Sequence, residues 1–292
     1  MANFETAAGG DIVDLEPADA LALCPLSNEA GWNQVAADWR LMLALGRGFG
    51  KKAKDGRWIG SALLLPLGPT LCWISMVLVT RPARGKGLGT QLLSRCLAAA
   101  RADGRTAGLD ATEFGRPIYL PLGFADVFAL ARWHWQAPTL SPVAPPAGVT
   151  VRAAARTDLA EIIAYDRPRS GFSREAILAE LLSRSCRFAH VARRSDAALT
   201  GFVLGRDGHR SWHLGPIVAD DEPTALALLS AAAAALAEPL IVDIPDCHHR
   251  LNDWLAQHGA TAPRRYMRML AGANFAIGQA GCVFALAGPE LG

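Results

Sequence analysis

A short loop with three glycines has the composition of a phosphate-binding site. Residues 84–89 read Arg-Gly-Lys-Gly-Leu-Gly. Backbone N–H groups of glycines at a helix N-terminus bind anions, and the side chains of Arg84 and Lys86 add positive charge there. A glycine cluster can also serve only as a turn, so the flanking segments decide between the two.

Those flanking segments favour a binding site. Residues 71–79 are almost all apolar, which predicts a strand buried on both faces. Apolar side chains then recur at helical spacing through residues 90–102. The spacing excludes a P-loop, which needs Gly-Lys-Ser/Thr. It also excludes the dinucleotide fingerprint, because Thr90 stands where the third glycine belongs.

Motifs in and after this loop resemble those of the GNAT family of N-acetyltransferases. Arg84, Gly87 and Gly89 match the family's Arg-x-x-Gly-x-Gly, and residues 119–124 match its Tyr-x-x-x-Gly-Phe. The resemblance covers roughly residues 10–136, and it is closest to members in which a second GNAT-like half follows. It implies an α/β (α+β) protein with two GNAT-like domains in tandem, each a mixed, largely antiparallel twisted sheet flanked by helices.

The resemblance also implies where acetyl-CoA, the cosubstrate, would bind. The loop would hold the pyrophosphate, and the preceding strand would pair with the pantetheine arm through exposed backbone. The N–H of Val77 could polarise the thioester carbonyl, and Thr112 stands where many members carry an asparagine that touches pantetheine. The implied donor-binding residues are Val77, Leu78, Val79, Arg84, Gly85, Lys86, Gly87, Leu88, Gly89, Thr90 and Thr112.

Tyr119 and Asp110 are the candidates for proton transfer. A phenol can protonate a departing thiolate, so Tyr119 is the predicted general acid, with packing against Phe124 as the alternative. Asp110 and Glu113 are the nearest acids that could deprotonate the amine. Asp110 could instead tie down the following turn, and water could relay the proton.

Trp32 and Asn33 are the candidates for binding the acceptor. Residues 19–45 predict two helices that break near Gly31, and the family's acceptor pocket borders this region. Polar amides beside a tryptophan are costly to bury without partners, although capping and packing would also explain them. The acceptor itself is predicted to be a small-molecule amine.

The second half repeats the architecture but not the loop. Residues 138–148 are rich in proline and predict a linker between a first domain, residues 1–137, and a second, residues 149–292. Residues 220–223, Asp-Asp-Glu-Pro, take the place of the glycine loop and would repel a pyrophosphate. The second half is therefore expected not to bind CoA, and the first to bind it alone. Trp212, His213 and Arg265 could line an acceptor pocket.

Composition narrows the classes further. The chain has 292 residues, 51% of them hydrophobic, with a formal net charge of +2. This favours a packed protein without nucleic-acid or membrane partners. A monomer or homodimer is expected. The six cysteines lack C-x-x-C spacing, and the N-terminus has no apolar core of signal length, which indicates a cytoplasmic protein without a metal site.

The predicted function is transfer of an acetyl group from acetyl-CoA to an amine. Two alternatives come from other classes. A non-catalytic acyl-CoA sensor would bind the donor and accept no amine, and a nucleotide-binding scaffold is disfavoured by the loop spacing.

Overall fold

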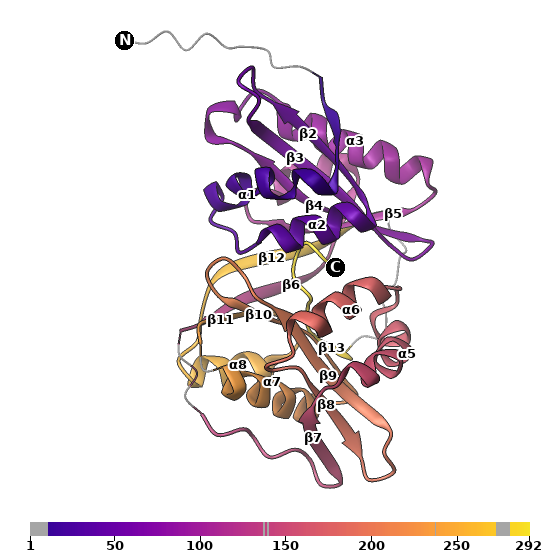
Figure 1. The fold of residues 1–292 in the computed structure, drawn as a ribbon, viewed down its shortest axis with the longest axis vertical. Helices are drawn as coiled ribbons and strands as arrows, with labels where there is room; N and C mark the ends of the chain where they lie inside the picture. Colours follow the sequence, from indigo (N-terminus) through magenta and orange to yellow (C-terminus); the bar gives the residue numbers. More distant parts are fainter. Residues whose placement is uncertain (1–10, 137, 139, 237, 273–280) are drawn as a thin grey trace. The chain divides into compact units, whose positions relative to one another are not determined.

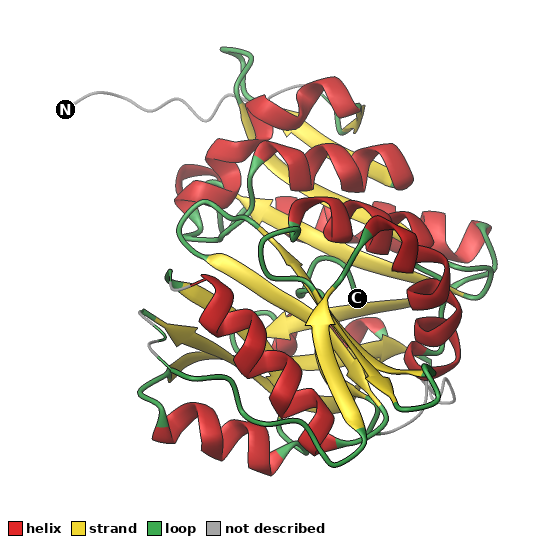
Figure 2. Cartoon of the chain, turned by 60° about the horizontal axis from the view of Figure 1, so that its bottom comes forward, coloured by secondary structure: helices red, strands yellow, loops and turns green. Residues whose placement is uncertain are grey.

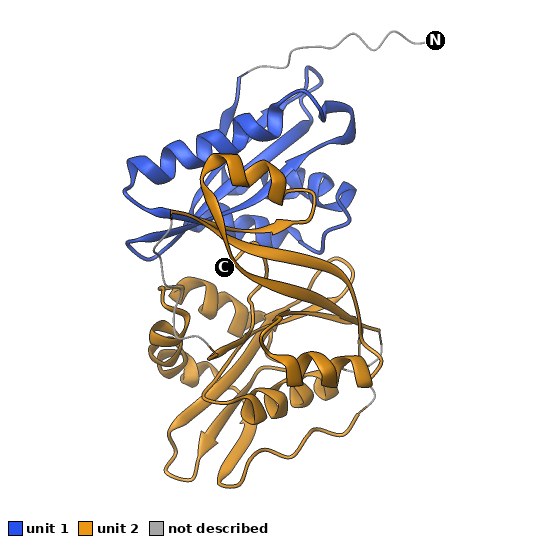
Figure 3. Ribbon diagram, turned by 180° about the vertical axis from the view of Figure 1, so that it is seen from behind, with its two compact units in different colours: residues 1–107 blue, residues 108–292 orange. Residues whose placement is uncertain are grey.

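The computed structural model describes residues 11–136, 138, 140–236, 238–272 and 281–292. The chain forms two compact units, residues 1–107 and residues 108–292, which divide inside strand β5 (Figure 3). Helices pack against the strands (Figure 2). The predicted mixed, largely antiparallel sheet flanked by helices is confirmed.

The described part of the first unit is an antiparallel sheet in the order β1-β2-β3-β4. Its strands are β1 (Val13–Leu15), β2 (Arg47–Lys52), β3 (Trp58–Leu67) and β4 (Leu71–Val79). Helices α1 (Ala20–Glu29) and α2 (Ala36–Leu45) cover one face, and α3 (Leu88–Ala102) covers the other (Figure 1). The core is dense because the apolar stripes predicted from spacing face the sheet: Trp39 of α2 and Leu92 of α3 are fully buried.

The strands of the second unit follow the order β5-β12-β6-β11-β10-β9-β8-β7, with β13 paired to β10. Its strands are β5 (Thr106–Thr112), β6 (Phe124–Trp135), β7 (Val149–Ala153), β8 (His190–Arg194), β9 (Leu199–Arg206), β10 (Trp212–Ala219), β11 (Leu240–Pro245), β12 (Thr261–Ala271) and β13 (Val283–Ala285). Its helices are α4 (Arg116–Tyr119), α5 (Leu159–Ser170), α6 (Glu175–Arg184), α7 (Glu222–Leu236) and α8 (His249–Gln257).

The two sequence halves exchange strands inside this unit. Strand β12, from the second half, lies between β5 and β6 of the first half, and β6 in turn pairs with β11 of the second. The compact units therefore divide at residue 107 rather than at the proline-rich residues 138–148. The predicted domains, residues 1–137 and 149–292, stay a prediction about independent folding.

Two buried ion pairs join the exchanged strands at equivalent positions. Arg268 of β12 stands opposite Asp110 of β5 and donates to both carboxylate oxygens, at 2.9 and 2.8 Å. Arg132 of β6 stands opposite Asp243 of β11 and does the same at 2.8 and 2.7 Å. All four side chains are buried. Removing one partner of such a pair typically costs about 3–5 kcal/mol, so these pairs hold the exchanged strands in register.

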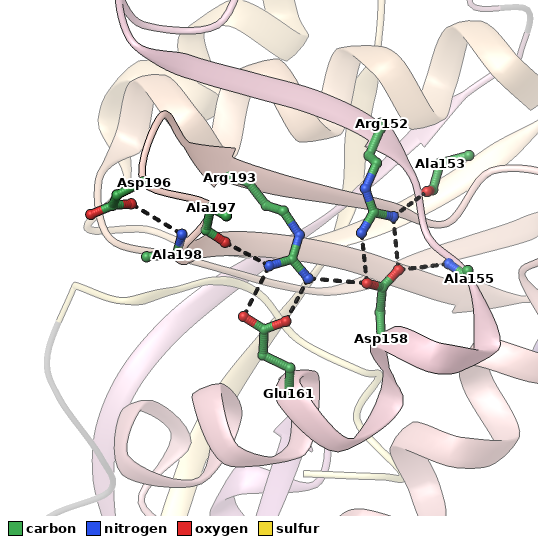
Figure 4. A network of polar contacts seen from close by, with 9 residues as sticks. All are labelled: Arg152, Ala153, Ala155, Asp158, Glu161, Arg193, Asp196, Ala197 and Ala198. Carbon is green, nitrogen blue, oxygen red and sulfur yellow. Dashed lines mark hydrogen bonds and ion pairs between the residues drawn. The ribbon is translucent and has the colours of Figure 1, made fainter.

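A further ion network ties β7 and β8 to the segment that leads into α5 (Figure 4). Asp158 accepts from the Arg152 guanidinium at 2.8 and 2.7 Å and from Arg193 at 3.0 Å. It also accepts from the Ala155 N–H. The hydrogen bonds from Arg152 hold the pKa of Asp158 well below its usual range.

Candidate active site

The loop between β4 and α3 has the backbone of an open anion site. Gly85 and Gly87 have φ of 74° and 77°, a left-handed conformation that favours glycine. A Cβ at either position would meet no atom within 4 Å, so the backbone, not crowding, requires glycine. Gly87 is the N-cap of α3 and supplies no side-chain acceptor. The first N–H groups of α3 are therefore left for a ligand.

The basic side chains of the loop lie close to the backbone. Arg84 Nε donates to the Val79 carbonyl at 2.9 Å, and Lys86 Nζ donates to the Pro82 carbonyl at 3.3 Å. Both acceptors are uncharged carbonyl groups, so the positive charges of Arg84 and Lys86 are not neutralised by these bonds. Glu29 accepts from the Arg81 N–H at 2.6 Å and lies 4.0 Å from the Arg84 guanidinium, which fixes the start of the loop. The loop presents positive charge beside the open helix N-terminus.

Strand β4 carries a bulge where the thioester was predicted to lie. Ser61 pairs with Leu78 and Leu63 with Ser75, so two residues of β4 stand opposite one residue of β3. Met76 has φ of 50°, and its carbonyl accepts from Ser61 Oγ at 2.8 Å. A bulge turns backbone groups out of the ladder, which suits the predicted role of the Val77 N–H. The motif pattern predicted where the thioester would lie along this strand, but it did not predict the bulge.

Tyr119 ends α4 in the second unit. Its ring centroid lies 5.9 Å from that of Phe124, so the packing contact named as the alternative is present. Its hydroxyl makes no hydrogen bond to any residue that the structure describes. Burial raises the pKa of Tyr119 to about 12, so the phenol keeps its proton at physiological pH. The side chain therefore combines a packed ring with a hydroxyl that can donate to a ligand.

Asp110 and Thr112 both have hydrogen-bond partners within the chain. Both oxygens of Asp110 are held by Arg268, and the carboxylate is fully buried. Burial raises the pKa of Asp110, and the Arg268 guanidinium opposes that shift, with burial the larger effect. The role of Asp110 as a base stays a prediction. Thr112 Oγ1 accepts from the Gly115 N–H at 3.1 Å, which leaves its own proton for donation.

Trp32 and Asn33 lie half-buried in the loop between α1 and α2. The Trp32 N–H donates to the Ser27 carbonyl at 2.9 Å. Their neighbour Gln34 is only 5% exposed, and its Oε1 has no hydrogen-bond partner among the described residues. Trp32 and Asn33 were named from the sequence, but their neighbour Gln34 was not. Its unpartnered oxygen could accept from a bound amine.

The corresponding helix N-terminus in the second half is already occupied. Strand β10 leads almost directly into α7, and Asp221 Oδ1 accepts from the Thr224 N–H at 2.8 Å. Glu222 Oε1 accepts from the Leu251 N–H at 3.1 Å. Asp220 accepts from Tyr165 and Arg169. Asp221 thus takes an N–H of the first turn of α7, and Asp220 and Glu222 add negative charge beside it.

The three weak candidates of the second half also have internal partners. Trp212 Nε1 donates to Glu238 at 2.9 Å. His213 is buried, and its Nε2 lies 3.1 Å from an oxygen of Asp243. Arg265 pairs with Asp246. These contacts account for all three without an acceptor.

Comparison with known families agrees with this geometry. A model described as "Acetyltransferase (GNAT) family" matches residues 23–120, and one described as "Acetyltransferase (GNAT) domain" matches residues 162–285. The chain is a tandem GNAT acetyltransferase. The second match lies in the half in which Asp221 caps α7. That half therefore has the GNAT fold without the glycine-rich loop.

Relatives of this tandem GNAT protein match nearly its whole length. The uncharacterized N-acetyltransferase YitH of Bacillus subtilis is 27% identical over 251 residues, 85% of this chain and 87% of that protein. A candidate acetyltransferase from Pyrococcus horikoshii has a TM-score of 0.77 at 19% identity, covering 100% of this chain and 99% of that one. A tandem GNAT protein from clavulanic acid biosynthesis has a TM-score of 0.64 at 16% identity, covering 91% and 99%. The two solved structures support the fold alone.

Two further features are absent from the residues that the structure describes. No helix there is long and apolar enough to cross a membrane. No group of three or more histidine, cysteine or acidic side chains there could hold a metal ion.

Proposed function

We propose that this protein transfers the acetyl group of acetyl-CoA to the amine of a small-molecule acceptor, with the donor held by the first GNAT domain. One observation carries the proposal: the N-terminus of α3 is open and capped by Gly87, whereas the N-terminus of α7 is capped by Asp221. A pyrophosphate needs free N–H groups and a positive potential, and the first of these two sites offers both.

The donor would lie along β4 from the loop to the bulge. The N–H groups of residues 85–90 would donate to the pyrophosphate oxygens, and Arg84 and Lys86 would add charge–charge attraction. The backbone of residues 77–79 would pair with the amides of the pantetheine arm. An N–H at the bulge, that of Val77, would donate to the thioester oxygen as negative charge develops there.

Transfer then needs one bond to form and one to break. The neutral amine nitrogen attacks the thioester carbon, the new C–N bond forms, and the C–S bond breaks as the Tyr119 hydroxyl gives its proton to sulfur. The amine's surplus proton passes to water, because Asp110 is held by Arg268. The phenol then regains a proton from solvent.

The surroundings of the acceptor are assigned to the loop between α1 and α2. Trp32 and Asn33 are half-buried there, and the adjacent Gln34 oxygen lacks a partner among the described residues. A small amine can use such an oxygen as a hydrogen-bond acceptor. All six cysteines are free, which supports placing the protein in the cytoplasm.

Calorimetry and turnover together test the proposal. Acetyl-CoA should bind once per chain, and the chain should release free thiol in the presence of at least one amine of a broad panel. Two equivalent donor sites would contradict the assignment to the first domain. Donor binding without thiol release from any amine would favour the acyl-CoA sensor instead.

A further inference from the structure

The second half keeps the strand geometry of a donor cleft. Strands β10 and β11 run parallel and pair from Trp212 to Leu214, and the pairing ends there. Beyond this point, Leu214 pairs with Gly205 of β9 and Ile217 pairs with Val203, so two residues of β10 stand opposite one of β9. This bulge has the same place in β10 that the bulge at Met76 and Val77 has in β4. The edge of β10 beyond its bulge is therefore open to another extended chain.

That edge is taken by the chain's own C-terminal segment, residues 282–292. Ala285 pairs with Ile217 of β10, and the Ala219 N–H donates to the Cys282 carbonyl at 3.0 Å. On the other side, the Leu286 N–H donates to the Asp243 carbonyl of β11 at 3.0 Å. The segment thus bonds to both strands at the place where they diverge.

Gly215 shows how closely the segment approaches the bulge. A Cβ on Gly215 would overlap the carbonyl oxygen of Leu286, so only glycine leaves room for the segment there. In the first half, the corresponding bulge is where we place the thioester. The C-terminal segment therefore occupies in the second half the position proposed for the acyl-pantetheine arm in the first.

Buried polar contacts anchor the end of the segment. Glu290 pairs with Arg206, whose guanidinium also donates to the Ala287 carbonyl at 2.6 Å. Arg174, itself paired with Asp166, donates to the Gly292 carbonyl at 3.2 Å. These contacts hold the segment against β9 and α6.

Apolar contacts complete the fit. Phe284 and Leu291 are 3% and 0% exposed. The ring of Phe284 lies against that of His248, with centroids 4.3 Å apart. The segment thus has the features of a bound peptide: backbone pairing, a buried aromatic side chain and a paired charge.

We propose that the cleft between β10 and β11 is a peptide-binding site whose ligand is the chain's own segment 282–292. The ligand is an extended peptide with a phenylalanine near its start and a glutamate near its carboxyl end. The peptide site stands on the contacts of the second half alone. Only its correspondence to a donor cleft rests on the proposed function. The segment closes this cleft to acyl-CoA and leaves one donor site per chain.

Cleavage of the folded chain tests the site directly. A protease recognition sequence inserted immediately before the exposed Gly281 allows the segment to be cut after folding. The cut segment should remain bound through gel filtration and should leave only after partial unfolding. Prompt loss of the segment, with an unchanged melting temperature, would overturn the proposal.

Rescue in trans gives a second readout. A chain that ends at residue 281 should melt at a lower temperature, and a synthetic peptide of residues 282–292 should restore that temperature with saturation. A scrambled peptide of equal composition should not. A peptide with Glu290→Gln should bind at least about tenfold more weakly, because Arg206 would be left buried without its counter-charge. Equal rescue by the scrambled peptide would refute the site. If the shortened chain does not fold, the cut full chain decides by itself, with Glu290→Gln introduced before cleavage.

None of these measurements uses acetyl-CoA or an amine. A failure of the peptide site would therefore leave the proposed acetyltransferase activity untouched, and absence of that activity would not change the outcome here.

Discussion

At the scale of single residues, the contrast between Gly87 and Asp221 underlies our proposal that only the first half binds a phosphate. Both residues precede a helix of 15 residues that follows a strand. Gly87 leaves the first turn uncapped, whereas Asp221 fills it with a carboxylate. An N-capping side chain and a bound anion compete for the same N–H groups, so we expect the residue type at this position to determine whether an anion binds.

The substitution Gly87→Glu tests this competition. A side chain at φ 77° is strained, and a carboxylate there would repel the pyrophosphate. We expect calorimetry to show at least about a hundredfold loss of acetyl-CoA affinity, which corresponds to about 2.7 kcal/mol. Gly104→Glu is the matched control, because Gly104 has φ of 65° and equally open surroundings at the other end of α3. Equal losses in the two variants would mean that strain, not the site, explains the effect.

Tyr119→Phe removes the proposed acid and keeps the ring against Phe124. The fold and the affinity for acetyl-CoA should stay unchanged. The single-turnover rate should fall by about 10² to 10⁴, the range for a lost general acid. A variant that retains at least about a third of the wild-type rate would mean that the thiolate takes its proton from water.

The pH profile gives an independent check on Tyr119. Its pKa is raised to about 12 by burial, and the acid works in its protonated form. Below that pKa the phenol stays competent, so the rate should rise with pH as the amine loses its proton and should show no alkaline fall before about pH 11. An alkaline limb near pH 8 or 9, present in the wild type and in Tyr119→Phe alike, would assign the acid to another group.

At the scale of elements, the network around Asp158 couples β7 and β8 to the start of α5. The pKa of this carboxyl is depressed by the Arg152 hydrogen bonds, whereas an unfolded aspartate has a pKa of about 3.9. The folded state therefore binds its proton less readily than the unfolded state. The stabilisation is complete above about pH 5 and is lost as the pH falls toward the folded pKa.

The substitution Asp158→Asn should remove that dependence. We expect a loss of about 1–3 kcal/mol in the free energy of unfolding at pH 7, because charge-assisted hydrogen bonds disappear. The loss should shrink as the pH falls below about 4. Urea titrations between pH 7 and pH 3 measure both effects. Asp196→Asn is the control, since Asp196 is exposed and its amide oxygen can still accept from the Ala198 N–H. Stability curves with the same pH dependence in wild type and Asp158→Asn would contradict the prediction.

Most elements could be predicted from the sequence because their signals are local. Residues 71–79 form the predicted strand, and the predicted helix at 90–102 begins two residues earlier, at Leu88. The two helices at the N-terminus break at the predicted place around Gly31. Each of these segments shows its own hydrophobic period, which a single sequence is enough to reveal.

Strand partners were not predictable in the same way. Arg268 lies 158 positions from Asp110, and the residues around each of them do not indicate that the two strands pair. The strand that carries Asp110 was predicted, but the ion pair with Arg268 was not. Asp110 was therefore interpreted as a possible base. The bulge in β4 was missed for a related reason, since a bulge depends on the register with β3 rather than on residue type. Motifs located the site, and long-range pairing determined which of its residues are free.

At the scale of the whole molecule, the exchange of β12 changes what a cut at the proline-rich segment would do. Sequence reasoning expected residues 1–137 to bind the donor alone. That fragment lacks β12, which pairs with both β5 and β6. In that fragment Asp110 would also lose its ion pair with Arg268.

We therefore expect residues 1–137 to be largely unfolded or aggregated when made alone, because unpaired strand edges associate with other chains. Co-expression with residues 149–292 should restore a soluble complex that binds one acetyl-CoA. Circular dichroism and size-exclusion chromatography measure the first result, and calorimetry measures the second. A monomeric fragment 1–137 with cooperative unfolding and full donor affinity would show that β12 is dispensable.

The exchange of strands between the two sequence halves has a consequence for how the gene can evolve. Each half of the gene encodes one strand that completes the other half's sheet: β6 stands beside β11, and β12 stands beside β5. A deletion of the second half would remove β12, with its Arg268, from beside β5 and β6. If only the first half binds the donor, as we propose, the second half is still needed for the sheet of the first. Mutations in β12 should then be selected through the activity of a loop that lies in the other half of the chain.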